Sequence, residues 1–182
     1  MPKRARRPDL REQLLDAAAD VVARDGAARL TLDRVAAEAQ VSKGGLLYHF
    51  PNKQALLEGM VEHMLSGVEA RLAKHQHALG DKPRAVIRSF VGAEIEQIPA
   101  ERNLSLALIA AGAEDPALLA PARAMLTQWT ERIEAESDDG ILLLLACEGV
   151  RLLSLFNLVP GGAKGQRALL ERVRAAAEGG LA

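Results

Sequence analysis

The chain has 182 residues, of which 49% are hydrophobic and 26% charged, with a formal net charge of −1. This hydrophobic fraction supplies a buried core and excludes wholesale disorder, while the single cysteine, Cys147, excludes an internal disulfide framework or a multi-thiolate metal site. The longest apolar run, 141–147, is far shorter than the roughly 20 residues that span a bilayer, and no apolar stretch of a secretory signal follows the basic N-terminus. We therefore expect a cytoplasmic protein.

The pattern of residue types is helical along the whole chain. Alanine and leucine dominate, aromatic residues make up only 3%, and β-branched and aromatic residues never cluster as they do in strands. The sequence therefore predicts an all-α fold with about nine helices.

The first two predicted helices are delimited by capping residues. Asp9 followed by Glu12 is typical of an N-terminal capping box, and it predicts a first helix that ends at Gly26. Thr31 predicts the start of a short second helix, which continues through about residue 39.

The third and fourth predicted helices meet at a proline. Ser42 caps the third helix, which ends before Pro51 because proline disfavours helical geometry in the preceding residue. Asn52 caps a long fourth helix over about residues 53–79, which carries a continuous apolar stripe.

Caps, prolines and glycines delimit five further helices. Their predicted ranges are about 83–99, closed by Pro99; 101–111; 115–136, opened by Asp115 and Pro116; 138–157; and 164–178.

Charge is distributed unevenly along the chain. Residues 1–53 carry ten basic against seven acidic side chains, whereas the remaining residues carry 13 basic against 17 acidic ones. A basic head on an acidic body is typical of a polyanion-binding module joined to another domain, and a merely solvated basic tail is the alternative.

Residues 31–53, TLDRVAAEAQVSKGGLLYHFPNK, match a helix-turn-helix. Ala36 allows the two short helices to approach closely, Val41 fills the turn, and Leu46 packs inward. A DNA-reading helix lays its N-terminal end in the major groove, where short side chains let the backbone come near base edges.

The start of the third helix has the composition of such an end. Lys43 offers one long donor, and Gly44 and Gly45 offer no side chain. Two glycines in a helix cost roughly 1 kcal/mol each relative to alanine, which is understandable if the backbone approaches DNA. Tyr48 shares a face with Lys43 rather than with Leu46, so we expect it to contact phosphate rather than the core.

Over about residues 9–58 the sequence resembles the N-terminal signature of the TetR family of transcriptional regulators, most diagnostically in VSKGGLLYHFPNKQALL. The resemblance implies a homodimeric repressor on a palindromic double-stranded DNA operator, with a DNA-binding domain over residues 1–52. It implies that residues 53–182 bind a small-molecule inducer and dimerise through the last two helices. It implies no cofactor and no membrane partner, and an activator is the alternative role.

The resemblance also assigns DNA contacts to individual positions. It implies a phosphate contact for Thr31, base-reading positions after Ser42, and an apolar contact for Leu47, where many members have tyrosine. Specificity would then lean on Lys43, the basic arm and DNA shape. The full set of implied DNA contacts is Arg4, Arg6, Arg7, Thr31, Ser42, Lys43, Gly44, Gly45, Leu47, Tyr48, His49 and Lys53.

In this architecture an inducer pocket would lie among the fifth to eighth helices. The candidate lining residues are Phe90, Glu94, Met125, Trp129, Glu148 and Arg151. A structural ion pair between Glu148 and Arg151, three residues apart, is the alternative, as is a core position for Trp129.

The eighth predicted helix is apolar around much of its circumference, so one face alone cannot bury it. We therefore expect a four-helix seam between two subunits. The candidate interface residues are Leu145, Leu152, Phe156, Leu169, Leu170 and Val173.

Other classes of function find little support in the sequence. It contains no nucleophile–base pair, phosphate-binding glycine loop after a strand, or metal-ligand spacing, so we do not expect an enzyme. We expect Cys147 to be a buried hydrophobe and the scattered histidines of the fourth helix to lie on the surface. A helical interaction module without DNA contact is the remaining alternative.

Overall fold

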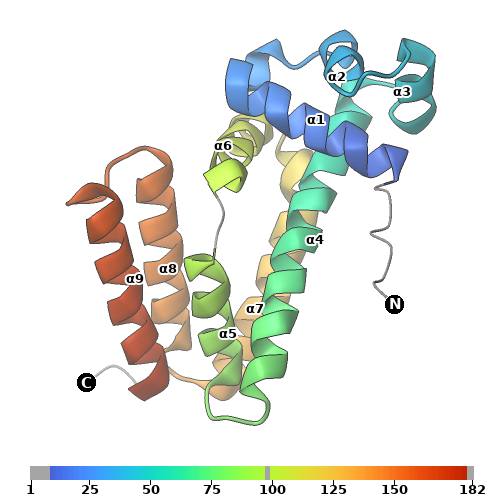
Figure 1. The fold of residues 1–182 in the computed structure, drawn as a ribbon. Coiled ribbons are helices and arrows are strands. Elements are labelled where there is room, and N and C mark those ends of the chain that lie inside the picture. Colours follow the sequence, from blue (N-terminus) through green and yellow to red (C-terminus); the bar gives the residue numbers. More distant parts are fainter. Residues whose placement is uncertain (1–8, 97–98, 180–182) are drawn as a thin grey trace, which may run out of the picture. The chain divides into compact units, whose positions relative to one another are not determined.

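The computed structural model describes residues 9–96 and 99–179, which form nine α-helices, two short 3-10 turns and no strand (Figure 1). This confirms the predicted all-α fold. The elements are α1 (Leu10–Asp25), η1 (Ala27–Arg29), α2 (Leu32–Glu38), α3 (Lys43–His49), α4 (Lys53–Leu79), α5 (Ala85–Ile95), α6 (Pro99–Glu114), η2 (Pro116–Leu119), α7 (Ala120–Glu136), α8 (Gly140–Leu155) and α9 (Gly162–Gly179).

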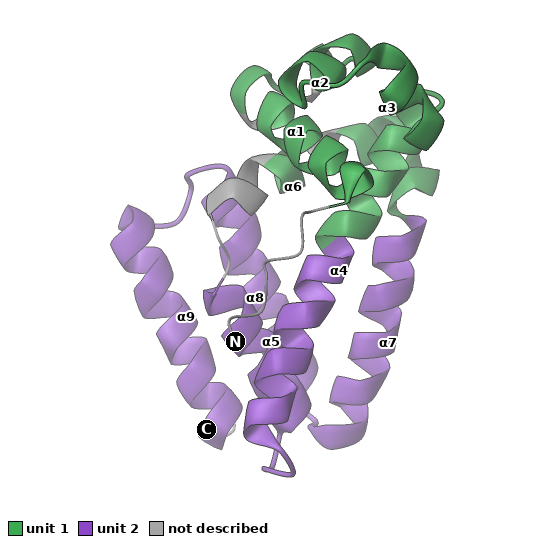
Figure 2. Cartoon of the chain, turned by 45° about the vertical axis from the view of Figure 1, so that its right-hand side comes forward, with its two compact units in different colours: residues 1–64, 100–119 green, residues 65–99, 120–182 purple. Residues whose placement is uncertain are grey.

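The chain divides into two compact units (Figure 2). Unit 1 comprises residues 1–64 and 100–119, and unit 2 comprises residues 65–99 and 120–182. This division differs from the expected boundary between residues 52 and 53, because the first turns of α4 are part of the core of unit 1. Leu56, Met60 and Val61 on those turns are at most 1% exposed.

Local capping explains where the first and fourth helices begin. The Asp9 N–H donates to the Glu12 carboxylate at 3.3 Å, as the capping box predicts. The Asn52 side-chain oxygen accepts from the Ala55 N–H at 2.8 Å, which satisfies one of the unpaired donors of the first turn of α4.

Two prolines have a different role from the one that the sequence pattern predicted. Pro99 begins α6 instead of closing α5, which already ends at Ile95. Proline suits the first helical turn because its missing N–H would be unpaired there in any case. Pro116 follows the cap Asp115, whose carboxylate accepts from the Ala117 N–H at 3.1 Å, but it opens the 3-10 turn η2 rather than α7 itself.

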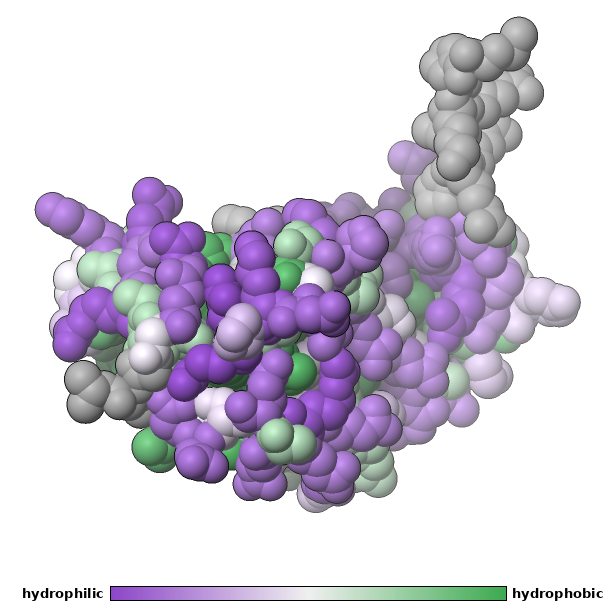
Figure 3. Space-filling view, turned by 90° about the horizontal axis from the view of Figure 1, so that it is seen from below, coloured by the Kyte–Doolittle hydropathy of each residue, from purple (hydrophilic) through white to green (hydrophobic). Residues whose placement is uncertain are grey.

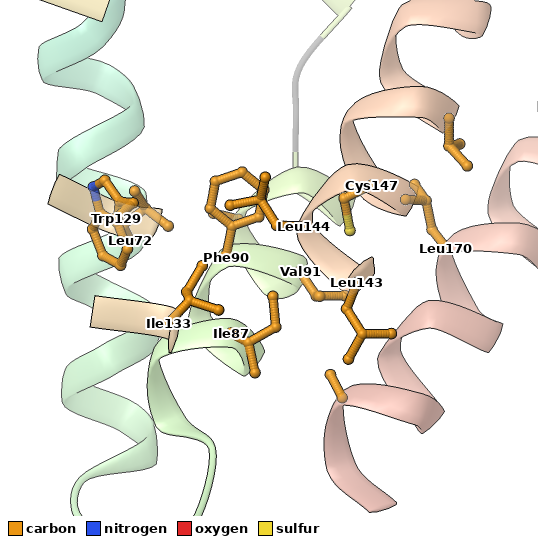
Figure 4. Close-up of a cluster of buried hydrophobic side chains, with 13 residues drawn as sticks. Leu72, Ile87, Phe90, Val91, Trp129, Ile133, Leu143, Leu144, Cys147 and Leu170 are labelled. Carbon is orange, nitrogen blue, oxygen red and sulfur yellow. The ribbon is translucent and has the colours of Figure 1, made fainter. Parts of the chain in front are cut away.

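The core of unit 2 is a cluster of buried side chains contributed by α4, α5, α7, α8 and α9 (Figure 4). Cys147 lies in this cluster with no exposed surface, as predicted. Burial raises the pKa of its thiol to about 12, and the carboxylates of Glu94 and Glu148 act in the same direction.

The face of the molecule in Figure 3 carries mostly hydrophilic side chains with isolated hydrophobic ones between them. Within the described residues, no helix combines the length and the apolar character needed to span a bilayer. Most of the large hydrophobic side chains that remain exposed lie on α8 or just after it: Leu142, Leu145, Leu152, Leu153, Phe156 and Leu158.

Candidate nucleic-acid interface

The helices α2 and α3 pack together as a helix-turn-helix. Val35 and Ala36 of α2 and Leu46 of α3 are buried, with at most 5% of their surface exposed. Each helix starts at a hydroxyl cap: Thr31 Oγ1 accepts from the Arg34 N–H at 3.3 Å, and Ser42 Oγ accepts from the Gly45 N–H at 3.1 Å. The predicted caps therefore fix both helix starts.

The turn between α2 and α3 is a Schellman motif. The Gln40 N–H donates to the Ala37 carbonyl at 3.2 Å, and the Val41 N–H donates to the Ala36 carbonyl at 3.0 Å. Gln40 has a φ of 56°, in the left-handed region where glycine is the usual residue. The sequence located this turn but gave no sign of the unusual backbone conformation of Gln40.

The backbone at the start of α3 is open to close approach. An ideal Cβ at Gly44 or Gly45 would have only the Ser42 Oγ within 4 Å, at 4.0 and 3.4 Å respectively, among the residues that the structure describes. No other part of the described chain therefore covers these two glycines. A base edge or a phosphate group that approached this surface could therefore contact the backbone of Gly44 and Gly45 directly.

The side chains that follow the glycines divide between surface and core. Tyr48 is 86% exposed, and its ring is nearly perpendicular to the His49 ring, with the centroids 5.2 Å apart. Leu47 is 37% exposed, whereas Phe50 is only 2% exposed. The exposure of Tyr48 agrees with the expected outward orientation. Phe50 has the extended backbone (φ −134°, ψ 93°) that Pro51 favours in the residue before it, and α3 ends there.

Phe50 anchors α3 to α4 at a glycine that the sequence analysis did not single out. An ideal Cβ on Gly59 would lie only 2.7 Å from Phe50 Cε1, so the ring rests directly on the α4 backbone. The Arg11 guanidinium also contacts Phe50: its carbon lies over the ring, 5.5 Å from the ring centroid, in a cation–π arrangement. The sequence did contain a signal for this contact, because Gly59 interrupts the apolar stripe of a long helix, where a glycine often marks close packing.

Ion pairs join α1 to α2 beside the helix-turn-helix. Arg24 Nη2 lies 2.8 Å from Glu38 Oε2, and Arg34 Nη1 lies 2.9 Å from Asp25 Oδ2. The hydrogen bond from Arg24 holds the pKa of Glu38 below its usual value. These two arginines are therefore engaged within the protein, in contrast to the exposed Lys53, for which the described residues show no ion pair.

Lys43 also has an acidic neighbour, since its Nζ lies 2.8 Å from Asp33 Oδ1 on α2. Both side chains are more than half exposed, so the pair is in contact with solvent. The three arginines of the basic arm, Arg4, Arg6 and Arg7, lie outside the described residues, and their DNA contacts stay a prediction.

The candidate inducer residues lie in or beside the core of unit 2. Phe90 and Trp129 are part of the buried cluster, and Met125 packs against it. Glu148 and Arg151 form the ion pair that was the alternative, with Arg151 Nε donating to Glu148 Oε2 at 2.9 Å. Their role toward an inducer, and that of the half-buried Glu94, stays a prediction.

The candidate dimer residues fall into two groups. Leu145, Leu152 and Phe156 are 46–58% exposed on α8 and its end. Leu170 on α9 is instead buried in the core of unit 2, with Leu169 and Val173 packed against that core. On α8, Leu143 and Cys147 are thus buried in the core of unit 2, whereas Leu145 and Leu152 remain exposed.

Two family models match the chain. The one described as bacterial regulatory proteins, tetR family, covers residues 14–60, and the one described as tetracyclin repressor-like, C-terminal domain, covers residues 80–178. The first match contains the helix-turn-helix, and the second contains α5 to α8 and almost all of α9.

The chain is also similar to individual proteins with known names. The HTH-type transcriptional regulator BetI of Burkholderia thailandensis is 36% identical over 96 residues, 53% of this chain and 49% of that protein. The chain thus spans about half the length of the curated relatives it matches. The multidrug binding protein EbrR complexed with ethidium has a TM-score of 0.63 at 26% identity, covering 91% of this chain and 98% of EbrR.

A structure of a TetR-family transcriptional regulator from Rhodococcus sp. has a TM-score of 0.74 at 20% identity. It covers 94% of this chain and 100% of the Rhodococcus chain. This similarity shows that the two proteins share a fold.

Proposed function

Since the chain belongs to the TetR family of transcriptional regulators and has its DNA-binding N-terminal domain, we propose that it is a homodimeric repressor. It binds a palindromic operator in the cytoplasm, and a small-molecule inducer bound to its C-terminal half releases it. The observation that carries the DNA-binding part of this proposal is the uncovered main chain at Gly44 and Gly45, flanked by exposed Lys43 and Tyr48.

In the proposed complex the N-terminal end of α3 enters the major groove. The two glycines let the backbone approach base edges, and Lys43 donates to a base acceptor such as guanine O6 or N7. Tyr48, His49 and Lys53 donate to phosphates on the flank, which positions the helix without reading sequence. Leu47 supplies an apolar contact to a thymine methyl group or a sugar.

The proposed dimer uses the uncovered stripe of α8. Leu145, Leu152 and Phe156 would be removed from water in a seam between two subunits, which accounts for large hydrophobic side chains left exposed on a single chain. Two-fold symmetry would then set the two α3 helices about 34–36 Å apart, the spacing of successive major grooves.

The proposed inducer acts by shifting a population between DNA-binding and released conformations. EbrR, which shares the fold, is a multidrug binding protein solved with ethidium, and we propose that this chain likewise binds a small organic molecule near Phe90, Trp129 and Glu94. Because α4 is continuous from Lys53 to Leu79 and contributes to both compact units, it is the proposed link between ligand and DNA.

The experiment that tests this function is a DNA titration with paired variants. A palindromic duplex from upstream of the protein's own gene should bind more tightly than its scrambled version. Lys43→Ala should reduce the ratio between the two affinities, whereas Lys53→Ala should weaken both equally and reduce the salt slope by about one. Equal binding of the palindromic and scrambled duplexes by the unmodified protein would contradict selective operator recognition.

A further inference from the structure

Unit 2 contains a cavity of about 290 Å³ that shares no residue with the proposed inducer or DNA contacts. It lies among α4, α5 and α9, and its lining is mainly apolar with a few charged groups. The residues that matter here are His75 and Leu79 of α4, Arg88 and Ile95 of α5, and Arg174 and Glu178 of α9.

Two of the lining residues, His75 and Gly92, are in close contact. An ideal Cβ on Gly92 would lie 2.7 Å from His75 Nδ1, so the imidazole packs directly on the α5 backbone. His75 Nε2 lies 3.4 Å from Glu96 Oε2, and Lys74 Nζ lies 3.0 Å from the same oxygen. The Glu96 carboxylate is therefore engaged by two cationic or potentially cationic neighbours and does not repel an anion strongly.

The Arg88 guanidinium has donors that the protein leaves without good acceptors. Its Nη1 donates to the Pro83 carbonyl at 3.4 Å, while its Nη2 lies 3.9 Å from Glu178 Oε1, a long separation for an ion pair. Its Nε is buried and has no hydrogen-bond acceptor among the described residues. Nη2 is therefore the donor of Arg88 that remains available to a carboxylate, and a hydrogen bond between two charged groups is stronger than one between neutral groups.

The other charged side chains of the lining, Arg174 and Glu178, do not prevent an anion from binding to Arg88. Arg174 Nη2 is paired with Glu171 Oε2 at 2.7 Å, and the Arg174 side chain is more than half exposed at the edge of the lining. Glu178 is the acidic group nearest to Arg88, and its side chain is 56% exposed. An incoming carboxylate therefore competes for Arg88 only with a distant, solvated partner.

We propose that this cavity binds a small organic carboxylate, as an effector site separate from the proposed inducer site. The carboxylate accepts from Nη2 of Arg88, and a short hydrocarbon part packs against Leu79 and Ile95. Such a site has the usual make-up of a small-molecule pocket, which is apolar walls with a few polar groups that fix orientation.

Hexanoate is a suitable probe, with 1-hexanol and hexylamine as controls of equal chain length. Isothermal titration of the full chain should show saturable binding of hexanoate, and binding of both controls weaker by about tenfold or more. Arg88→Gln should weaken hexanoate binding by a similar factor. Arg172→Gln, which removes an exposed arginine of α9 outside the cavity, should leave it unchanged.

In a second variant, Glu178→Gln, the affinity for hexanoate should change in the opposite direction. Glu178→Gln removes the carboxylate that competes for Arg88, so it should strengthen hexanoate binding severalfold, and its result decides the matter if Arg88→Gln fails to fold. The proposal is overturned if hexanoate does not bind, if folded Arg88→Gln binds it as well as the unmodified protein, or if Glu178→Gln weakens it. Retained binding in Arg88→Gln would place hexanoate at another site.

Discussion

Lys43 and Asp33 form an ion pair across the helix-turn-helix, with Lys43 Nζ 2.8 Å from Asp33 Oδ1. The side chains are 59% and 70% exposed, so the pair contributes at most about 1 kcal/mol to stability. A DNA base or phosphate can therefore displace Asp33 readily. In the free protein, however, the acidic partner reduces the attraction between Lys43 and any polyanion and holds the lysine beside α2.

Asp33→Asn should consequently increase binding to DNA of unrelated sequence more than binding to the operator. The slope of log affinity against log salt should become steeper by up to about one, because Lys43 becomes free to neutralise a phosphate. Fluorescence anisotropy with operator and scrambled duplexes at several salt concentrations measures both effects. Asp20→Asn, which removes an exposed charge from α1, is the matched control, and an equal change in both variants would contradict a specific role for Asp33.

Gln40→Gly should stabilise the protein. Gln40 has a φ of 56° and is exposed, so glycine relieves the left-handed strain of about 1 kcal/mol without loss of a buried contact. Ala39→Gly, one residue earlier at a φ of −73°, should instead destabilise by about 0.5–1 kcal/mol. Urea denaturation measures both values, and a destabilising Gln40→Gly would show that its side chain has a stabilising role.

Gly59→Ala should destabilise the protein even though alanine is the better helix former. The added Cβ would lie 2.7 Å from the buried Phe50 ring, and such overpacking costs about 1–3 kcal/mol, which exceeds the roughly 1 kcal/mol gained in helix propensity. It should also weaken operator binding, because the contact of Phe50 with α4 holds α3 in place.

Gly67→Ala is the control on the same helix. Apart from the helix's own backbone and the two neighbouring residues, the described part of the chain places only Arg71 Nη1 within 4 Å of an ideal Cβ there, at 3.9 Å. This variant should be more stable than the unmodified protein. Thermal melting of the two variants gives the comparison, and shifts of the same sign would contradict the close packing of Phe50 on α4.

Cys147 should resist thiol reagents in the folded protein. Burial raises its pKa to about 12, so the nucleophilic thiolate is scarce at pH 8 and no part of the residue is exposed. The neutral thiol also contributes stability that is present below the unfolded pKa of about 8.5 and is lost as pH rises toward the folded value. Reaction with Ellman's reagent should require denaturant, and rapid labelling of native protein would contradict this burial.

The sequence predicted the parts of the fold that depend on local chemistry. Caps such as Thr31, Ser42 and Asn52 satisfy donors within their own first turn, so their positions alone indicate helix starts. Pro99 was assigned to the wrong helix because proline suits both the region after one helix and the first turn of the next.

The features that the sequence did not indicate depend on packing and on backbone conformation. The contact of Gly59 with Phe50 joins two helices, and the pairing of Asp33 with Lys43 exists only once α2 and α3 have docked. Leu170 was a dimer candidate because it is an apolar residue of the last helix; in the structure it lies in the core of unit 2, and its role in a dimer stays a prediction. Periodicity identifies an apolar face without stating which surface covers it.

Tyr48→Ala gives the most direct test of the central claim, that the exposed surface of α3 is pressed into duplex DNA. Because Tyr48 is 86% exposed, its removal should change the free energy of unfolding by no more than about 0.5 kcal/mol. Measured by fluorescence anisotropy on the operator duplex, its affinity should fall by about tenfold or more, since a phosphate contact is lost. An unchanged affinity in this fully folded variant would contradict the account.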